Sequence, residues 1–202
     1  MELRHQAVGP WSVNTYVLIC PTTGDSVLCD PGAEPDTLEK LLEDSHPTAI
    51  LVTHAHPDHI GALKQMRDRL KVPVMAHAGN GSGVEADHWL GDGAHLQVGR
   101  YRLRVFHTPG HTPGQVCYAI EESRHILVGD TIFEGGPGRT GSPADFETTL
   151  ATLRNVVLTW PDDTICHPGH GTFFRLGDQR AAIDRFLQKD HGRFCGDATW
   201  GQ

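Results

Sequence analysis

The sequence lacks long apolar runs, an excess of basic residues and a secretion signal. No apolar stretch approaches the roughly 20 residues that a membrane helix needs, and residues 1–5 do not combine a basic with an apolar segment as a signal peptide does. The formal net charge is −8 at pH 7, whereas nucleic-acid-binding surfaces carry a basic patch. We therefore expect a cytoplasmic protein that binds neither nucleic acid nor a membrane. No pattern predicts its oligomeric state.

Cysteine is also scarce and unpaired. Five cysteines occur in 202 residues, and none forms a C-x-x-C pair: Cys20, Cys29, Cys117, Cys166 and Cys195. Their odd number and scattered positions argue against a disulfide framework and favour separate free thiols. Histidine, in contrast, occurs 14 times.

Three of these histidines and an aspartate are concentrated in one short stretch, Thr53-His54-Ala55-His56-Pro57-Asp58-His59. It follows the apolar run 49–52, which predicts a buried strand. His54 and His56 are two residues apart, so in an extended segment their side chains point the same way. Asp58 and His59 lie where apolar residues begin to recur at helical spacing. Because imidazole and carboxylate are common zinc ligands, this strand-to-helix loop is predicted to present two adjacent pairs of metal ligands.

The order of the predicted elements indicates an α/β protein with helices covering two sheets. We expect one domain over residues 1–202, a length that can bury a sizeable core. Strands are predicted at 3–8, 13–20, 26–29, 49–52, 72–76, 94–98, 101–106, 115–120, 125–128 and 163–166, and helices from 35, at 58–70, 143–158 and 176–189. Residues 78–92 are expected to form a loop, and the glycine-containing tail from 190 to 202 is expected to fray.

Further polar clusters follow predicted strands. They are His107 to His111, Gly129-Asp130, and His167 to Gly171, and Asp30 ends an earlier strand in the same way. In layered α/β folds the loops at one edge of a sheet converge on the functional site. We therefore expect these clusters to meet the histidine-rich stretch.

These motifs, in this order, resemble those of the metallo-β-lactamase superfamily over about residues 10–190. The resemblance rests on 53–59, on Thr108-Pro109-Gly110-His111-Thr112-Pro113-Gly114, on Gly129-Asp130 and on Pro168-Gly169-His170-Gly171. It implies the family's four-layer αβ/βα sandwich, in agreement with the element order.

The resemblance also implies a binuclear metal site. His54, His56 and His111 would hold the first ion, Asp58, His59 and His170 the second, and Asp130 would bridge both. Asp30 would support a ligand imidazole from outside the site, while the adjacent His107 and His167 would be structural. Such a donor set, with positions left for water, is typical of catalytic sites. Zinc is the expected ion, and iron and manganese also suit nitrogen and oxygen donors.

Within the superfamily the chain most resembles glyoxalase II, hydroxyacylglutathione hydrolase, especially its short bacterial type. The resemblance implies hydrolysis of a glutathione thioester such as S-lactoylglutathione by a hydroxide that bridges the metals, with Asp58 orienting this nucleophile. Larger members have a C-terminal helical extension that grips glutathione, which this chain is expected to lack. They also have a Lys-x-Tyr glutathione contact where this chain reads Arg139-Thr140-Gly141. Arg139 is therefore a candidate contact for a substrate carboxylate.

Alternatives to this activity stay open. Gly-Arg-Thr after the bridging Asp is shared with the persulfide dioxygenases, which use a single iron, although those have Pro-Ala-His-Asp where this chain has Pro168-Gly169-His170-Gly171. A lactonase is the second alternative. Hydrolysis of β-lactams is disfavoured by the absence of a secretion signal and by Asp, not Cys, ahead of the second-site histidine. A silent metal-binding or sensor domain is the non-enzymatic alternative, and the complete ligand set argues against it.

Overall fold

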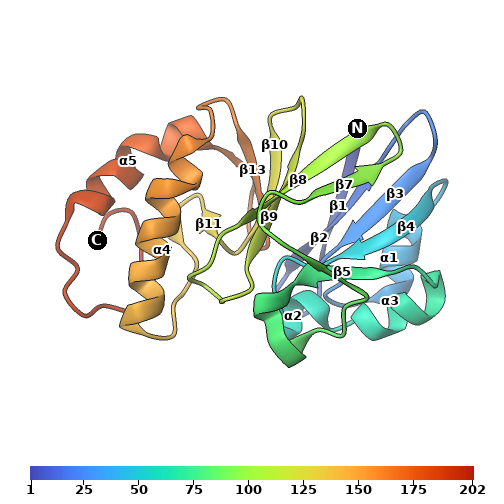
Figure 1. The fold of residues 1–202 in the computed structure, drawn as a ribbon, viewed down its shortest axis with the longest axis horizontal. Coiled ribbons are helices and arrows are strands. Elements are labelled where there is room, and N and C mark those ends of the chain that lie inside the picture. The colour runs from blue at the N-terminus through green and yellow to red at the C-terminus, as the bar shows by residue number, and fades with distance from the viewer.

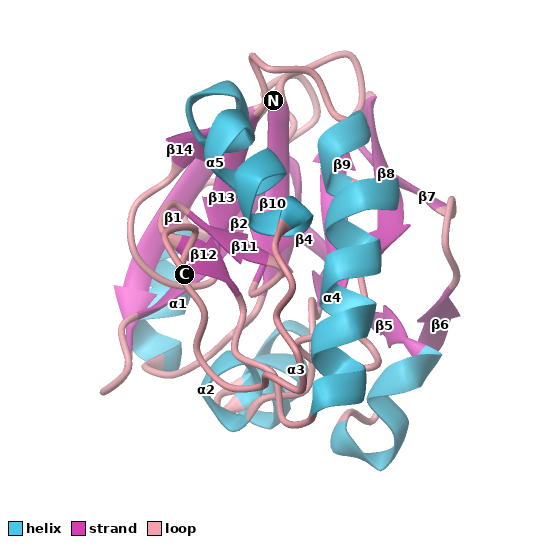
Figure 2. Ribbon diagram, turned by 90° about the vertical axis from the view of Figure 1, so that its left-hand side faces the viewer, coloured by secondary structure: helices cyan, strands magenta, loops and turns pink.

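Two six-stranded sheets pack face to face and carry helices on their outer faces. The computed structural model describes residues 1–202. In Figure 1, α1 (Pro35–Leu41), α2 (Pro57–Ile60) and α3 (Leu63–Leu70) lie at one end of the molecule, and α4 (Pro143–Asn155) and α5 (Leu176–Gln188) at the other. Figure 2 shows α4 and α5 in front of the strands of the second sheet. This is the four-layer αβ/βα sandwich that the sequence predicts.

The first sheet has its strands in chain order. They are β1 (Glu2–Val8), β2 (Val13–Ile19), β3 (Asp25–Cys29), β4 (His46–Leu51), β5 (Val74–His77) and β6 (His88–Leu90). The first three strands pair antiparallel, as in Tyr16 opposite Cys29, and β3 to β6 pair in parallel. The carboxyl ends of β3 and β4 consequently lie at the same edge of this sheet.

The second sheet is mostly antiparallel. Its order is β14 (Phe174–Arg175), β13 (Ile165–Pro168), β10 (His125–Gly129), β9 (Val116–Ile120), β8 (Tyr101–His107) and β7 (His95–Val98). Only β10 and β13 pair in parallel, so their carboxyl ends also lie at one edge. A short ribbon of β11 (Ile132–Phe133) and β12 (Gly136–Pro137), and two 3₁₀ turns, η1 (Ala78–Gly83) and η2 (Val157–Thr159), complete the fold.

Three apolar clusters correspond to the three spaces between the four layers. On β2, Tyr16 and Leu18 belong to the cluster between the sheets, whereas Val17 and Ile19 belong to the cluster under α1 and α3. This alternation follows from the two-residue period of a strand that is buried on both faces. The third cluster, with Phe146 on α4, fills the space beneath α4 and α5.

The predicted helix at 58–70 is wrong in one respect, because it is two helices. The first ends at Ile60 and the second begins at Leu63. Between them the backbone N–H of Ala62 donates to the carbonyl of Pro31 at 2.9 Å. This bond to the loop after β3 replaces a helical bond and turns the chain. The short strands β6 and β14 were also not predicted, β6 lying in the expected loop at 78–92.

The tail, which was expected to fray, instead packs on the second half of the chain. Ala198 and Trp200 are buried, and the Trp200 indole N–H donates to the carbonyl of Glu134 at 3.1 Å. Gly196 forms an isolated β-bridge with Thr140. Burial of the Trp200 indole stabilises this segment by more than the flexibility of its glycines destabilises it.

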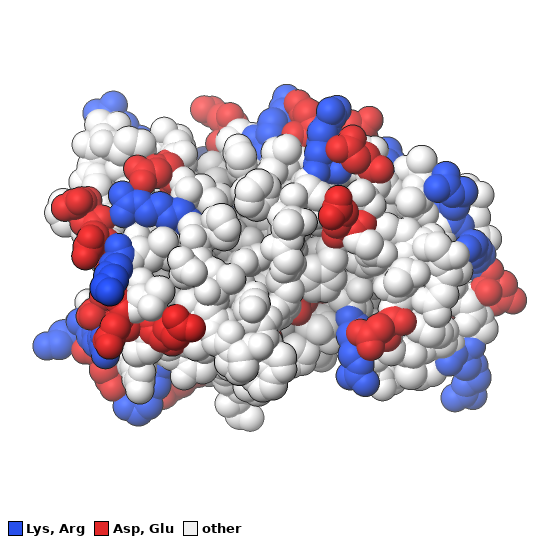
Figure 3. All heavy atoms as spheres, turned by 180° about the vertical axis from the view of Figure 1, so that it is seen from behind, with Lys and Arg blue, Asp and Glu red and all other residues white.

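The surface is mixed in charge, and no helix has the length and apolarity needed to span a membrane. On the face shown in Figure 3, Lys and Arg lie next to Asp and Glu along the edges, and uncharged side chains cover most of the centre. This face therefore has no continuous basic patch.

Candidate metal centre

The sequence-predicted metal ligands come together where loops of the two sheets meet. The loops follow β4, β8, β10 and β13, and they bring in His54, His111, Asp130 and His170 respectively. Two backbone hydrogen bonds join the sheets at this edge, from Asn14 to the carbonyl of Gly169 at 2.7 Å and from Val116 to that of Thr53 at 3.0 Å. The site is therefore built on the rigid strand ends of both sheets.

The first cluster consists of three imidazole nitrogens. His54 Nε2 is 3.0 Å from His56 Nδ1, His56 Nδ1 is 2.9 Å from His111 Nε2, and His111 Nε2 is 3.3 Å from His54 Nε2. Three nitrogens around one tetrahedral zinc ion at 2.0–2.1 Å would be about 3.3 Å apart. The triangle thus has nearly the size that one ion requires.

The outer nitrogens of two of these rings fix their tautomers. His111 Nδ1 donates to the carbonyl of Arg139 at 2.7 Å. His54 Nδ1 is 3.1 Å from the Thr53 hydroxyl, which itself donates to Asp30 and so accepts from the ring. Neutral His54 and His111 therefore turn their Nε2 lone pairs towards each other. Such a contact is repulsive unless a cation lies between them.

The second cluster combines a carboxylate with two imidazoles. Asp58 Oδ2 is 3.1 Å from His170 Nε2 and 3.9 Å from His59 Nε2. His170 Nδ1 donates to the carbonyl of Trp11 at 3.0 Å, and His59 Nδ1 is 2.8 Å from Asp30 Oδ2. His59 Nε2 is buried and has no hydrogen-bond partner. Since buried polar atoms are normally paired, this vacancy fits a metal ligand.

Asp130 lies between the two clusters. Its Oδ2 is 3.5 Å from His111 Nε2 and 3.7 Å from His170 Nε2, and its Oδ1 is 3.4 Å from His59 Nε2. Oδ1 is also buried without a hydrogen-bond partner. The residues present thus fit a divalent metal site with donors on both sides of one carboxylate.

The electrostatics of the two clusters differ. Burial lowers the pKa of His54, and the neighbouring His59 and His111 lower it further, which keeps this ring neutral as a ligand must be. Burial also lowers the pKa of His59, but Asp30 and Asp130 outweigh this effect and raise it to about 10. The carboxylates thus favour a positive charge at His59, and a metal ion that binds there would replace a proton.

Asp30 supports ligands of both clusters from outside. Its carboxylate accepts from the backbone N–H of Thr53 at 2.7 Å and from the Thr53 hydroxyl at 2.6 Å, in addition to its contact with His59. Asp30 has a φ of 53°, a left-handed conformation that Asp tolerates better than most residues. The predicted contact of Asp30 with a ligand imidazole is therefore present, and Thr53, inside the motif, is a supporting residue that sequence analysis did not single out.

A glycine makes room for the second cluster. A Cβ on Gly169 would lie 2.2 Å from Asp130 Oδ1 and 2.5 Å from His59 Cε1. Any side chain at this position would displace two of the predicted ligands. This explains why the motif around His170 carries glycine immediately before the ligand.

The remaining predicted residues lie around the clusters. Arg139 is exposed, its backbone carbonyl orients His111, and its Nε is 3.5 Å from a carboxylate oxygen of Asp197. His107 and His167 lie outside both clusters, where they contact the carbonyl of Pro113 and His125 Nδ1. All five cysteines are free, and four of them are buried.

Residues 8–170 match the Metallo-beta-lactamase superfamily. The chain belongs to this superfamily. Among its superfamily relatives, a probable metallo-hydrolase, YqgX, of Bacillus subtilis strain 168 is 35% identical over 85% of this chain and 90% of that protein. Hydroxyacylglutathione hydrolase GloC of Haemophilus influenzae is 30% identical over 81% of this chain and 88% of that protein. A hydroxyacylglutathione hydrolase of Salmonella enteritidis is 33% identical over 73% of this chain but only 57% of that protein.

Solved superfamily structures agree with the fold. The BLEG-1 B3 metallo-beta-lactamase has a TM-score of 0.80 at 34% identity and covers 93% of this chain and 100% of that chain. ETHE1 from Myxococcus xanthus has a TM-score of 0.83 at 28% identity, over 94% of this chain and 86% of that chain. TTHA1623 in a di-iron-bound form has a TM-score of 0.74 at 32% identity, over 88% of this chain and 96% of that chain. The relatives thus support a metallo-hydrolase superfamily member and differ in the activities that their names give.

Proposed function

We propose that this superfamily member hydrolyses the thioester of a 2-hydroxyacyl glutathione, such as S-lactoylglutathione. The observation that carries the proposal is the complete donor set on both sides of Asp130, with buried unpartnered atoms on Asp130 and His59. Similarity to two hydroxyacylglutathione hydrolases supports the choice of substrate. A cytoplasmic location belongs to the same proposal and is supported by the five free cysteines.

Each predicted residue has a role in this proposal. One ion would be held by His54, His56 and His111, the other by Asp58, His59 and His170, and both by Asp130. The ions, when bound, would supply an activated water and polarise the thioester carbonyl. Zinc is the ion we propose, and the di-iron form of a related structure keeps iron as the alternative.

Asp58 is proposed to orient the attacking water. Its Oδ2 is 3.1 Å from His170 Nε2, and 21% of its side chain is exposed, so it reaches the open side of the site. A carboxylate there can accept a proton from the water as it attacks. The leaving thiolate needs no acid, because its conjugate thiol already has a pKa near 8.5.

Arg139 is proposed to bind a glutathione carboxylate. Its backbone carbonyl contacts His111 at 2.7 Å, and its exposed guanidinium forms an ion pair with Asp197 of the kind that contributes little. Substitution Arg139→Ala is expected to raise KM for S-lactoylglutathione about tenfold with a smaller effect on kcat, since a charge-assisted contact is lost. S-lactoyl-N-acetylcysteamine, a thioester without those carboxylates, is the control, and its KM should stay unchanged. An unchanged KM for the glutathione thioester would remove Arg139 from substrate binding.

A persulfide dioxygenase is the second candidate, because the ETHE1 structure covers nearly the whole chain. The dioxygenases that the sequence resembles use a single iron. A second donor cluster, formed by Asp58, His59 and His170, therefore favours the hydrolase. A lactonase and a silent metal-binding or sensor domain would use the same donor set, so substrate turnover must distinguish them from the hydrolase.

One experiment separates these functions. The purified protein is assayed with S-lactoylglutathione, glutathione persulfide, a homoserine lactone and a β-lactam, and its metal content is measured on the same sample. We expect thioester hydrolysis with two ions per chain. One iron per chain with persulfide-dependent oxygen uptake would replace the hydrolase by the dioxygenase, and no turnover of any substrate by the metal-loaded protein would favour the sensor.

A further inference from the structure

A pocket lies on the outer face of the second sheet, away from the metal centre. Its volume is about 380 Å³, within the range of small-molecule sites. It opens at the start of β10, where Ile126 lines it, whereas Asp130 follows the end of the same strand. Four residues of extended chain, roughly 13 Å, separate these positions. The pocket is therefore distinct from the metal centre.

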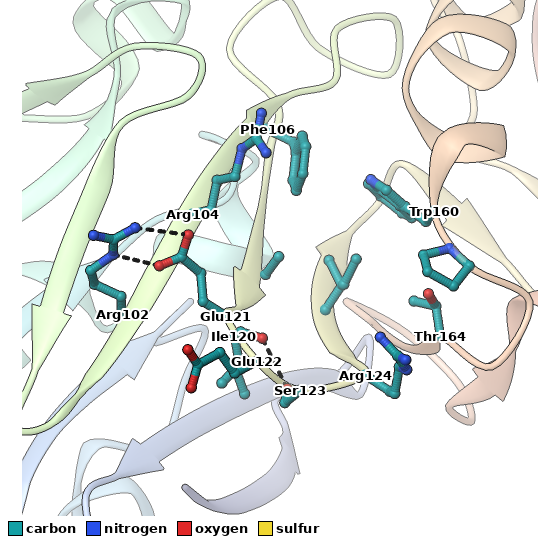
Figure 4. Close-up of a pocket in the computed structure, with 13 residues that line it drawn as sticks. Arg102, Arg104, Phe106, Ile120, Glu121, Glu122, Ser123, Arg124, Trp160 and Thr164 are labelled. Carbon is teal, nitrogen blue, oxygen red and sulfur yellow. Dashed lines mark hydrogen bonds and ion pairs between the residues drawn. The ribbon is translucent and has the colours of Figure 1, made fainter.

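The walls of this pocket are partly aromatic. Phe106 on β8 and Trp160 after η2 lie next to each other, with ring centroids 5.6 Å apart and ring planes tilted by 59° (Figure 4). Ala119 and Ile126 add apolar surface from β9 and β10. Such walls suit a flat apolar ring.

One arginine of the pocket has no carboxylate partner. Arg102 donates twice to Glu121, and Arg124 donates to Asp163 at 2.7 Å. The guanidinium of Arg104 forms no ion pair or hydrogen bond, and its Cζ lies 4.7 Å from the centroid of the Phe106 ring. Figure 4 shows Arg104 next to Phe106. Glu122, the other carboxylate of the lining, is exposed and has no ion pair. A guanidinium held on an aromatic face and free of a counterion is available for an anion.

A second unpartnered donor lies at the back of the pocket. Trp160 is only 5% exposed, yet its indole N–H has no hydrogen-bond partner. Figure 4 shows the indole nitrogen at the end of the ring that faces Phe106. Buried donors are normally satisfied, so this unpaired N–H is suited to an acceptor atom on a ligand. Phe106 packs against the indole in the free protein, so its half-buried ring must turn for a ligand atom to reach the nitrogen.

We propose that this pocket binds a small planar aromatic carboxylate. One carboxylate oxygen pairs with Arg104, the ring packs against Phe106 and Trp160, and the other carboxylate oxygen accepts from the Trp160 indole N–H. No bond is made or broken, and the site is independent of the hydrolase proposal.

Benzoate tests the proposal on the metal-loaded full chain. The protein carries four tryptophans. When their indoles are labelled with ¹⁵N, the Trp160 resonance is identified as the one that is absent from the spectrum of the Trp160→Phe variant. Benzoate is expected to shift this resonance saturably with a Kd of about 1 mM, and to leave the other three in place. Arg104→Gln is expected to weaken binding about tenfold or more. Arg193→Gln removes the same charge from an exposed position of the tail and should change the Kd less than about twofold.

Two further probes separate the parts of the ligand. Benzamide keeps the ring without the charge, and inorganic phosphate keeps the charge without the ring. Each is expected to bind about tenfold or more weakly than benzoate. No shift of the Trp160 resonance with benzoate up to about 10 mM, or equal benzoate affinity of the wild type and Arg104→Gln, would overturn the proposal. Equal binding of benzamide or of phosphate would overturn it as well.

Discussion

A single buried carboxylate, Asp30, orients predicted ligands that belong to both clusters. It accepts directly from His59 and reaches His54 through the Thr53 hydroxyl. The hydroxyl can do this because it donates to Asp30 and accepts from the His54 ring at the same time. Such outer partners fix ring orientation and make the ligands more basic.

Substitution Thr53→Val tests this connection. It removes the hydroxyl at nearly constant volume and leaves the buried His54 Nδ1 without an acceptor. We expect zinc affinity to fall about 10–100-fold, and stability to fall by about 1–3 kcal/mol because a buried polar group is left unpaired. Competition with a fluorescent chelator and denaturant unfolding measure the two effects. Thr53→Ser keeps the hydroxyl and should behave like the wild type. If the valine variant held zinc as tightly as the serine variant, the connection would be unimportant.

For individual residues, the sequence predicts which side chains form the site better than it predicts which groups hold those side chains in place. All seven predicted ligands meet in space, because imidazoles and carboxylates after strand ends form a recognisable pattern. The carbonyls of Trp11 and Arg139, which orient His170 and His111, were not predicted. Every residue has a carbonyl, so its use in a site has no signature in the sequence.

At the scale of elements, the parallel pair β10 and β13 brings Asp130 next to the second cluster. The pair ends at Gly129 and Pro168, and the backbone N–H of Gly169 donates to the carbonyl of Gly129 at 2.9 Å. This bond places the backbone of Gly169 directly against Asp130 and His59. Two loops distant in the sequence are thus held at contact distance by strand pairing.

Substitution Gly169→Ala is expected to break this arrangement. The added Cβ would lie 2.2 Å from Asp130 Oδ1, so a ligand carboxylate or the β13 loop must move. We expect metal content to fall towards one ion per chain and kcat to fall about 100-fold, as for an active-site displacement of about 1 Å. Gly135→Ala is the matched control, since a Cβ there meets nothing within 4 Å. Full metal content and activity in Gly169→Ala would mean that the site is more deformable than its packing indicates.

Long periodic elements were predicted from the sequence, and short or interrupted ones were not. The longer strands of both sheets and helices α1, α4 and α5 follow apolar patterns that local physics sets. The break between α2 and α3 depends on Pro31, and β14 has only two residues. Both features depend on tertiary contacts that a local pattern does not contain.

For the whole molecule, the metal centre joins the two halves of the chain. The predicted ligands come from the first sheet and from the second, and without an ion the lone pairs of His54 and His111 face each other at 3.3 Å. Removal of the metal by a chelator is therefore expected to lower Tm by about 10 °C, because an ion at 1,000 times its Kd stabilises the fold by about 4 kcal/mol. Calorimetry before and after zinc is restored measures the effect, and Asp130→Ala should not respond to the chelator. Equal Tm values of the wild type with and without metal would contradict this coupling.

The C-terminal tail packs against α5, and its contribution to the stability of the fold is measurable. Trp200 contacts Phe186 on α5, with ring centroids 5.4 Å apart, and its backbone N–H donates to Gly135 at 3.0 Å. Substitution Trp200→Ala leaves a cavity in the core beneath α4 and α5 and is expected to lower the free energy of unfolding by about 3 kcal/mol, or Tm by about 6–12 °C. Trp89→Ala is the control, because Trp89 is 51% exposed and should change stability by less than about 0.5 kcal/mol. Equal effects of the two substitutions would show that the tail is not part of the folded core, since burial alone distinguishes the two indoles.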